Sequence, residues 1–306
     1  MFTNMLLTAA LAIGISAQGV RRKLEDLYWL RTQCTVAVAV VGNYIAAQGG
    51  SEEYEDSELM TRRGKHVRNL DHVGIYFVGG PTGLIYAAGQ GSIFAVNSRD
   101  QEVLSFGSLG KRPDQFSKGG DRYGNLVDGP QYLAVGPKGD IFAYDQGTQT
   151  VKHFDSKGKF LNSFTSDVIK RKNVTGFAAD AQDHVYLSLV GKLDKAEGFV
   201  ACYSASGHLV RTLGSLGNGV GQFLLDKDNA GTSGPEAIAI GADGKIYVGD
   251  SYGAEVEIFD KTGKPLKTLP IEQRNYPGYV IYGLAVDKQG NLYGATETGL
   301  FARRRH

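Results

Sequence analysis

A short pattern that recurs along the chain limits what it can fold into more than any other feature. Residues Gly241–Asp250 read GADGKIYVGD, which is a Gly-rich turn, a β-prone run and an acid. Asp-Gly signals a tight turn, and Ile, Tyr and Val favour a pleated strand. Related stretches occur at Pro137–Asp145, Lys288–Thr296, Gln182–Leu189, Pro81–Gly89 and Val41–Gly49. Such recurrence indicates a repeat architecture.

Each copy follows a small or apolar run, and several continue into a second hairpin, as in Val151–Phe164 and Val256–Leu269. A unit of about 40 residues with four short strands is typical of a propeller blade. The apolar runs begin near Val36, Ile75, Tyr132, Gly176, Ala237 and Gly283. We therefore predict an all-β fold: a six-bladed β-propeller of four-stranded antiparallel blades over residues 35–306.

The last repeat is too short to supply four strands, because the chain ends soon after Leu300. The segment 18–34 has no blade of its own, and its stretch Arg22–Leu30 could provide the missing strand. We expect this N-terminal strand to close the last blade. A short surface helix is the alternative for the same residues.

Composition fits this class of fold and narrows the partners. The chain has 42 Gly and 8 Pro, which suits many tight turns between short strands. A formal net charge of +1 gives no overall field that favours nucleic acid, so a nucleic-acid partner is not expected. Two cysteines, Cys34 and Cys202, are too few for a disulfide framework and are expected as free, mostly buried thiols.

The N-terminus carries an apolar run from Met5 to Ala17 that ends in small residues. The run is too short for a comfortable transmembrane helix, so no stable transmembrane anchor is expected. Residues 1–17 are predicted to be a secretory signal peptide, and the protein to be secreted or periplasmic. The run lacks a preceding Lys or Arg. An uncleaved anchor or core helix is therefore the alternative.

The amino-acid sequence of the repeats resembles that of the NHL-repeat family. Gly234–Leu269 and Gly129–Phe164 match the unit well, and the connecting phrases FGSLGKRPDQF (Phe106–Phe116) and LGSLGNGVGQF (Leu213–Phe223) are similar to the family's inter-repeat phrase. The resemblance implies a propeller. It leaves function open, because propellers host binding, scaffolding and several chemistries.

Asp145 and Asp250 end the second strands of the two best repeats, where we expect each to cap the turn into the third strand. The long connections that lead into these repeats carry further acids, Asp121 and Asp128 in one, Asp226 and Asp228 in the other. Clustered oxygens suit Ca²⁺. No calcium-loop motif is present, so solvated or turn-capping acids are favoured, with Ca²⁺ binding through Asp121, Asp226 and Asp228 as the alternative. No other cofactor is expected.

The same repeats also indicate whether the chain carries the metal ligands of a related enzyme. The lyase that cleaves α-hydroxyglycine peptides is a related propeller whose zinc-binding histidines precede first strands, and the matching positions here are Gln131, Glu236 and Tyr282. Zinc needs several nitrogen or sulfur ligands, so this resemblance argues against that reaction. A metal-assisted lyase or hydrolase with other ligands, lactonase-like or amidating-lyase-like, is the alternative function.

Aromatic and basic residues in inter-blade loops favour a binding role. They are Arg122, Tyr123, Arg274, Tyr276 and Tyr279, and Tyr and Arg are enriched at binding hot spots. We expect a binding or interaction module that takes a protein, peptide or glycan ligand. Its further ligand-binding candidates are Asp128, Gln131, Asp145, Glu236 and Asp250. The tyrosines could instead cover blade edges, and a structural part of a surface assembly is a third reading.

Overall fold

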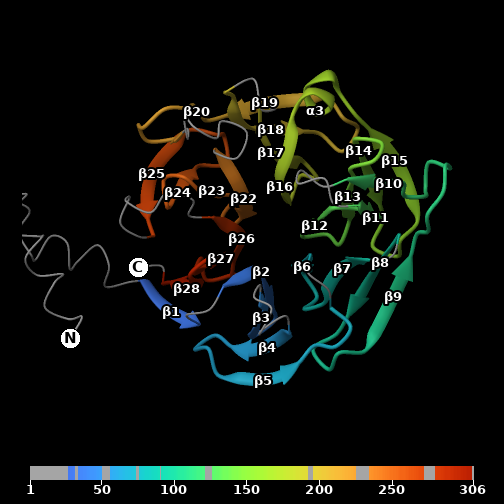
Figure 1. Ribbon diagram of the computed structural model, residues 1–306, viewed down its shortest axis with the longest axis horizontal. Helices are drawn as coiled ribbons and strands as arrows, with labels where there is room; N and C mark the ends of the chain where they lie inside the picture. The colour runs from blue at the N-terminus through green and yellow to red at the C-terminus, as the bar shows by residue number, and fades with distance from the viewer. Residues whose placement is uncertain are drawn as a thin grey trace, which may run out of the picture.

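Six four-stranded antiparallel sheets surround a common centre in the computed structural model of this chain (Figure 1). The structure describes residues 27–31, 34–49, 56–73, 76–89, 91–120, 126–191, 196–224, 234–271 and 280–304. The arrangement is a six-bladed β-propeller, which confirms the predicted fold class. In each of the first five blades the four strands follow one another along the chain.

The strands of blades 1 to 3 are as follows. Blade 1 contains β2 (Thr35–Val41), β3 (Tyr44–Gly49), β4 (Ser57–Thr61) and β5 (His66–Asn69). Blade 2 contains β6 (Phe77–Gly79), β7 (Ile85–Gly89), β8 (Ser92–Val96) and β9 (Glu102–Phe106). Blade 3 contains β12 (Tyr132–Val135), β13 (Ile141–Asp145), β14 (Thr150–Phe154) and β15 (Phe160–Phe164).

Blades 4 and 5 repeat this plan, and blade 6 departs from it. Blade 4 contains β16 (Asn173–Ala179), β17 (Val185–Val190), β18 (Gly198–Tyr203) and β19 (Leu209–Leu213). Blade 5 contains β22 (Pro235–Ile240), β23 (Ile246–Asp250), β24 (Glu255–Phe259) and β25 (Pro265–Pro270). Blade 6 contains β26 (Ile281–Val286), β27 (Leu292–Thr296), β28 (Gly299–Arg303) and, from the other end of the chain, β1 (Leu27–Arg31).

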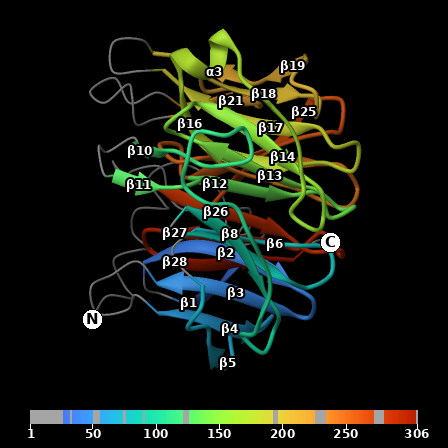
Figure 2. The ribbon, with the colours of Figure 1, turned by 90° about the vertical axis from the view of Figure 1, so that its right-hand side faces the viewer.

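The first strand of each blade lies nearest the centre, and the fourth lies on the perimeter (Figure 1). The face where the first strands begin also carries the connections between blades, and we call it the connector-side face. Two of these connections contain extra short strands: β10 (Lys118–Gly120), β11 (Leu126–Asp128), β20 (Ser215–Leu216) and β21 (Gln222–Phe223). Seen edge-on, β10 and β11 stand at one side of the ring (Figure 2).

Blade 6 is completed by the N-terminal strand, as the sequence predicted. Strand β1 pairs antiparallel with β28, with Leu27 opposite Arg303 and Tyr28 opposite Ala302. Trp29, the only tryptophan of the chain, meets Phe301 edge to face with ring centroids 6.2 Å apart. The segment is therefore a strand over residues 27–31 and not the alternative surface helix.

Two further contacts tie blade 1 to blade 6. Arg62, in the outer turn of blade 1, forms an ion pair with Asp287, whose side chain is buried in the inner turn of blade 6. The Arg62 guanidinium also donates to the Gly42 carbonyl at 2.7 Å. Leu30 of β1 packs over Gly64 of blade 1. The joint that closes the ring is thus held by strand pairing, an ion pair and apolar contact together.

A seven-residue turn links the third and fourth strands in all five blades that have a continuous chain. The N–H of its fifth residue donates to the side-chain oxygen of its first residue, at 2.9–3.2 Å. Its fourth residue has a positive φ of 62–91°. These side-chain caps explain the repeated polar residue at position 1. The copies are Thr61–Val67, Asn97–Val103, Asp155–Leu161, Ser204–Val210 and Asp260–Leu266.

These turns also contact the outer strand of the preceding blade. A Cβ at Gly158 would lie 2.5 Å from ring atoms of Phe106, the last residue of β9, so only glycine fits there. Its φ of +80° demands glycine as well. Phe164 contacts Gly207, and Leu213 contacts Gly263, in the same way. The outer strands therefore follow one another around the perimeter, each ending on the next blade's turn (Figure 1).

The hydrophobic core lies between neighbouring blades. Phe142 and Tyr144 of blade 3, for example, share one buried cluster with Val185 and Leu187 of blade 4. All four side chains are 0% exposed, and burying each apolar side chain of this size contributes about 1.5–3 kcal/mol. Both faces of each blade must therefore be covered by neighbours, which a closed ring achieves.

Among the described residues the one helix is α3 (Asp167–Arg171), which precedes blade 4 and is capped by Ser166. Neither Cys34 nor Cys202 forms a disulfide, and Cys202 is buried while Cys34 is half-buried. No helix in this part of the chain is long and apolar enough to cross a membrane. The predicted signal peptide, residues 1–17, lies outside the described residues.

Removing residues 1–33 should open the ring. Blade 6 would keep three strands and expose Phe301, so we expect a lower melting temperature and a broad transition by circular dichroism. A synthetic peptide of residues 22–33 should then restore the sharp transition. Because it carries the only tryptophan, its docking should blue-shift the tryptophan fluorescence. An unchanged melting curve after the deletion, or equal rescue by a scrambled peptide, would contradict this closure.

Candidate functional site

The candidate site lies on the connector-side face, where long connections enter blades 3 and 5. Connector A (residues 107–117) and connector B (residues 214–224) have matching internal hydrogen bonds. Gly110 N–H donates to the Phe116 carbonyl at 2.8 Å, and Gly217 N–H donates to the Phe223 carbonyl at 2.9 Å. Both phenylalanines are 0% exposed. The two connectors are therefore one structure used twice.

A glutamine side chain closes each connector. Gln115 Oε1 accepts from Arg112 N–H at 3.2 Å, and its Nε2 donates to Ser108 Oγ at 3.0 Å. Gln222 Oε1 likewise accepts from Gly219 N–H at 2.9 Å. The repeated G-S-L-G-x-x-x-x-Q-F phrase thus encodes a frame with four variable residues at its tip. Apolar anchoring and side-chain hydrogen bonds fix this frame on the ring.

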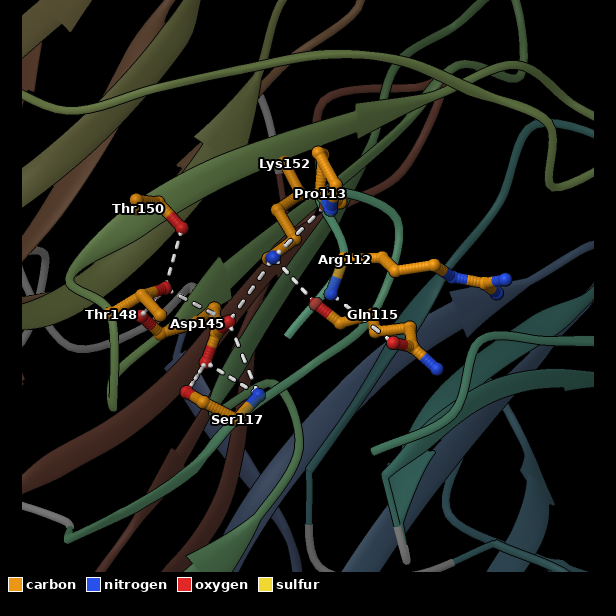
Figure 3. Close-up of polar contacts among 8 residues, drawn as sticks. All are labelled: Arg112, Pro113, Gln115, Ser117, Asp145, Thr148, Thr150 and Lys152. Carbon is orange, nitrogen blue, oxygen red and sulfur yellow. Dashed lines mark hydrogen bonds and ion pairs between the residues drawn. The ribbon is translucent and has the colours of Figure 1, made fainter. Parts of the chain in front are cut away.

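Asp145 is bound to connector A through Ser117 (Figure 3). Its carboxylate accepts from Ser117 Oγ at 2.6 Å and from Ser117 N–H at 3.3 Å. Thr148 Oγ1, in the turn into the third strand, donates to it at 2.9 Å. The side chain is fully buried and forms an ion pair with Lys152 at 3.3 Å. Asp145 therefore joins the turn to the connector.

Lys152 completes the attachment of connector A (Figure 3). Its Nζ donates to the Gln115 carbonyl at 2.6 Å and to the Pro113 carbonyl at 3.1 Å. Lys152 is only 5% exposed, and a buried ammonium needs a counter-ion and hydrogen-bond acceptors. Asp145 and the two carbonyls supply them. The pair thus ties the third strand of blade 3 to the connector.

Asp250 occupies the same position in blade 5 and contacts connector B. Its carboxylate accepts from Leu224 N–H at 2.7 Å and from Gly253 N–H at 3.3 Å. The second contact is the predicted cap of the turn into the third strand, and it is confirmed. The first, to the connector, was not anticipated. Asp250 is 0% exposed, so its role in the described structure is internal.

The residue that corresponds to Lys152 in blade 5 is an acid, Glu257, which also lies seven positions after the aspartate. Glu257 Oε2 accepts from Gly221 N–H at 2.6 Å, and its Oε1 accepts from Thr268 Oγ1 at 2.7 Å. Connector A offers carbonyls to a lysine here, whereas connector B offers an N–H to a glutamate. The two attachments therefore have opposite polarity.

Three carboxyl groups are consequently buried around connector B: Asp250, Glu255 and Glu257, each no more than 3% exposed. Burial raises the pKa of Asp250 to about 7; the N–H groups of Leu224 and Gly253 oppose the rise, and the charges of Glu255 and Glu257 add to it. The protonated form of Asp250 is thus favoured in the folded protein below about pH 7.

The predicted positions before the first strands are brought to the same place in their blades. Gln131 and Glu236 directly precede the strand residues Tyr132 and Ala237, and both are 4% exposed. Tyr282 occupies the matching position in blade 6 and is 39% exposed. These residues lie at the connector-side ends of the first strands. They supply an amide, a carboxylate and an aromatic ring near the centre of the ring.

Tyr76, which the sequence analysis did not single out, joins them. It directly precedes β6 and is 42% exposed. Its ring centroid is 6.3 Å from that of Tyr132, which in turn is 6.4 Å from Tyr144. Tyr144 is fully buried in the core between blades 3 and 4. A chain of three tyrosines thus runs from the core to the surface.

The other predicted residues contribute less to this picture. Asp128 forms an exposed ion pair with Lys118 at 3.4 Å, between the short strands β11 and β10. The remaining loop candidates lie outside the described residues; they are Asp121, Arg122, Tyr123, Asp226, Asp228, Arg274, Tyr276 and Tyr279. Within the described part of the chain, no three His, Cys, Asp or Glu side chains gather as a metal site.

Comparisons with known proteins agree with this fold. No curated protein shows significant sequence similarity to the chain. A family model described as "Strictosidine synthase-like, N-terminal" matches residues 225–254, which include β22 and β23. The match covers a small part of the chain, in one of its two clearest repeats.

Solved structures resemble the chain over most of its length. A streptogramin B lyase is 8% identical, with 92% of this chain and 98% of that chain covered and a TM-score of 0.56. A catalytically inactive virginiamycin B lyase from Staphylococcus aureus, with quinupristin, is 11% identical over 90% and 98% (TM-score 0.54). A Bacteroides thetaiotaomicron protein of unknown function is 13% identical over 90% and 70% (TM-score 0.58). At these identities the likeness is one of fold, and the class that it defines is the six-bladed β-propeller.

Replacing Lys152 by Met should destabilise the protein. The change leaves the Asp145 carboxylate and the connector carbonyls buried without their cation, which costs about 3 kcal/mol. Urea unfolding followed by circular dichroism would measure this. Lys159→Met, on the exposed outer turn of the same blade, is the matched control and should change the free energy of unfolding by less than about 0.5 kcal/mol. Equal stability of the two variants would contradict the role of Lys152.

Proposed function

We propose that the chain is an exported NHL-repeat propeller that binds a partner on its connector-side face. The observation that carries this is the placement of exposed aromatic residues. Among the described residues, Tyr76 and Tyr282 are the only large aromatic side chains that are exposed, and both begin first strands on this face. Tyrosine at a rigid, partly exposed position is a frequent binding hot spot.

Rigidity supports the same proposal. The Tyr76 ring packs against Tyr132, which in turn packs against the buried Tyr144. The Tyr76 side chain therefore has little conformational freedom to lose on binding. Connector A is fixed to the third strand of blade 3 by Lys152. A partner would therefore meet a preformed surface.

The chemistry of this face suits a protein, peptide or glycan partner. Tyrosine rings offer apolar surface together with a hydroxyl, as Tyr76 and Tyr282 do here. Such groups recognise hydroxyls and amides, which all three partner classes present. A net charge of +1 does not favour nucleic acid. Export is proposed from the apolar residues 1–17, and NHL repeats from the wording of Gly129–Phe164 and Gly234–Leu269.

Selection experiments test the proposal. A phage-displayed dodecapeptide library and a glycan array should be screened against the immobilised full chain. Binders enriched on the wild type are expected to lose at least about tenfold in affinity for Tyr76→Ala and Tyr282→Ala, because each change removes an aromatic contact worth more than about 1 kcal/mol. Biolayer interferometry gives the dissociation constants.

The matched controls are Val103→Ala and Leu161→Ala, which are 53% and 46% exposed on the outer strands. They should leave affinity unchanged. Melting curves of all four variants establish that the ring remains folded. Binders that ignore both tyrosines, or that respond to the outer-strand variants instead, would overturn the proposal.

A metal-assisted lyase is the second candidate, supported by the names of the solved neighbours, two of which are lyases. It predicts bound Zn²⁺, Ca²⁺ or Mn²⁺ near one equivalent by elemental analysis of the protein purified without chelators. It also predicts that quinupristin, the compound named with one neighbour, is consumed in a mass-spectrometric assay, with loss of activity in Glu236→Gln. Metal below 0.1 equivalent together with intact quinupristin would exclude this form of it.

A further inference from the structure

Connectors A and B share one frame, yet the groups that attach them to the ring differ in charge. Connector A is attached by an ion pair, Asp145 with Lys152, whose charges compensate each other. Connector B is attached by carboxyl groups, Asp250 and Glu257, through the N–H groups of Leu224 and Gly221. The two attachments therefore differ in which side chains make them and in whether those side chains meet carbonyls or N–H groups of the connector.

We propose that connector B is a pH-dependent element, held on the ring at acid pH and released as the pH approaches neutrality, while connector A stays attached throughout. The inference concerns the connectors themselves and does not depend on which partner the face binds.

The surroundings of Asp250 give the physical reason. On strand β24, Glu255 and Glu257 face it; from connector B it receives the Leu224 N–H, and from the following turn the Gly253 N–H. The groups that donate to Asp250 are thus neutral, while the two nearest charges are negative. An ionised Asp250 is then costly to bury, and opening of the connector, which admits water, removes that cost.

The direction of the pH effect follows from linkage. The attached state holds its proton on Asp250 up to about pH 7, whereas a solvated aspartate loses it near its ordinary value of 3.8. The attached state therefore binds more protons between these values, and raising the pH across this window weakens the attachment. The effect is complete above about pH 7. Its upper limit is about tenfold in the opening equilibrium per pH unit within the window.

Hydrogen exchange of the full chain, measured by mass spectrometry at pH 4.5 and 7.5, tests the proposal. Protection factors, normalised to intrinsic rates at each pH, should fall at least tenfold for peptides covering residues 214–224. Peptides covering residues 107–117 provide the internal comparison and should change less than threefold. Core strands β13 and β23 should stay protected at both pH values, which separates connector release from global unfolding.

Two variants make the test specific. Asp250→Asn cannot ionise, so the pH dependence of residues 214–224 should disappear. Glu257→Gln removes one neighbouring charge, so the transition should move to lower pH, and this variant serves if Asp250→Asn fails to fold. Equal protection of connector B at both pH values, the same fall in connector A or the core strands, or an unaltered fall in both variants would overturn the inference.

Discussion

Closure of the ring is the condition on which the rest of the structure depends. Each blade is a twisted sheet with apolar residues on both faces, so a blade without a neighbour on one side would expose a cluster such as that between Tyr144 and Leu187. The last blade has four strands only because β1 crosses from the N-terminal end to pair with β28. Residues 269–276 positions apart must therefore come together before the final blade is complete, and contacts of this sequence separation make folding slow.

The closed ring in turn holds in place the partners that offset the desolvation cost of the buried charges. Removing a carboxylate from water is costly unless hydrogen bonds and charge compensate it, and only a rigid frame holds those partners in place. In blade 3 the partners include Lys152, whose Nζ reaches two carbonyls of connector A. Connector A offers the carbonyls of Pro113 and Gln115 to Lys152, whereas connector B offers the N–H of Gly221 to Glu257. The residue seven positions after the aspartate is thus a lysine where the connector offers carbonyls and a glutamate where it offers an N–H. As a result, Asp145 and Asp250 lie in different electrostatic environments.

The fold could be predicted from the sequence because the signals in each repeat act between residues that are close in the chain. Polar caps, a positive-φ residue and a β-prone run recur at fixed spacing, and each acts within a few residues, as in Asp155–Leu161. The ring-closing strand could be inferred as well, since the last repeat lacked one. The site was less accessible. Asp145 and Asp250 were recognised as equivalent, yet their second partners are Ser117 and Leu224, more than twenty residues away and, for Leu224, a backbone N–H that leaves no trace in side-chain type.

Other parts of the site had a sequence signal that alignment of the two repeats could have revealed. Lys152 and Glu257 lie seven residues after their aspartates, and their opposite charge marks a position where the two blades differ. Tyr76 had no such signal, because it precedes a first strand whose repeat is weak. Its significance depends on exposure and on its distance from Tyr132, which only the folded ring defines.

The distribution of exposed apolar residues decides which surface of the ring is available for binding. In five blades one aliphatic residue of the outer strand is left unpaired by a β-bulge; these are Val67, Val103, Leu161, Val210 and Leu266, at 39–53% exposure. Bulges on edge strands prevent pairing with other chains, so the fold itself accounts for these positions. No comparable backbone irregularity accounts for the exposure of Tyr76. Tyr76 directly precedes a regularly paired first strand, and its ring continues a row of tyrosines that ends in the buried Tyr144. The exposed apolar surface that a partner would cover therefore lies on the connector-side face.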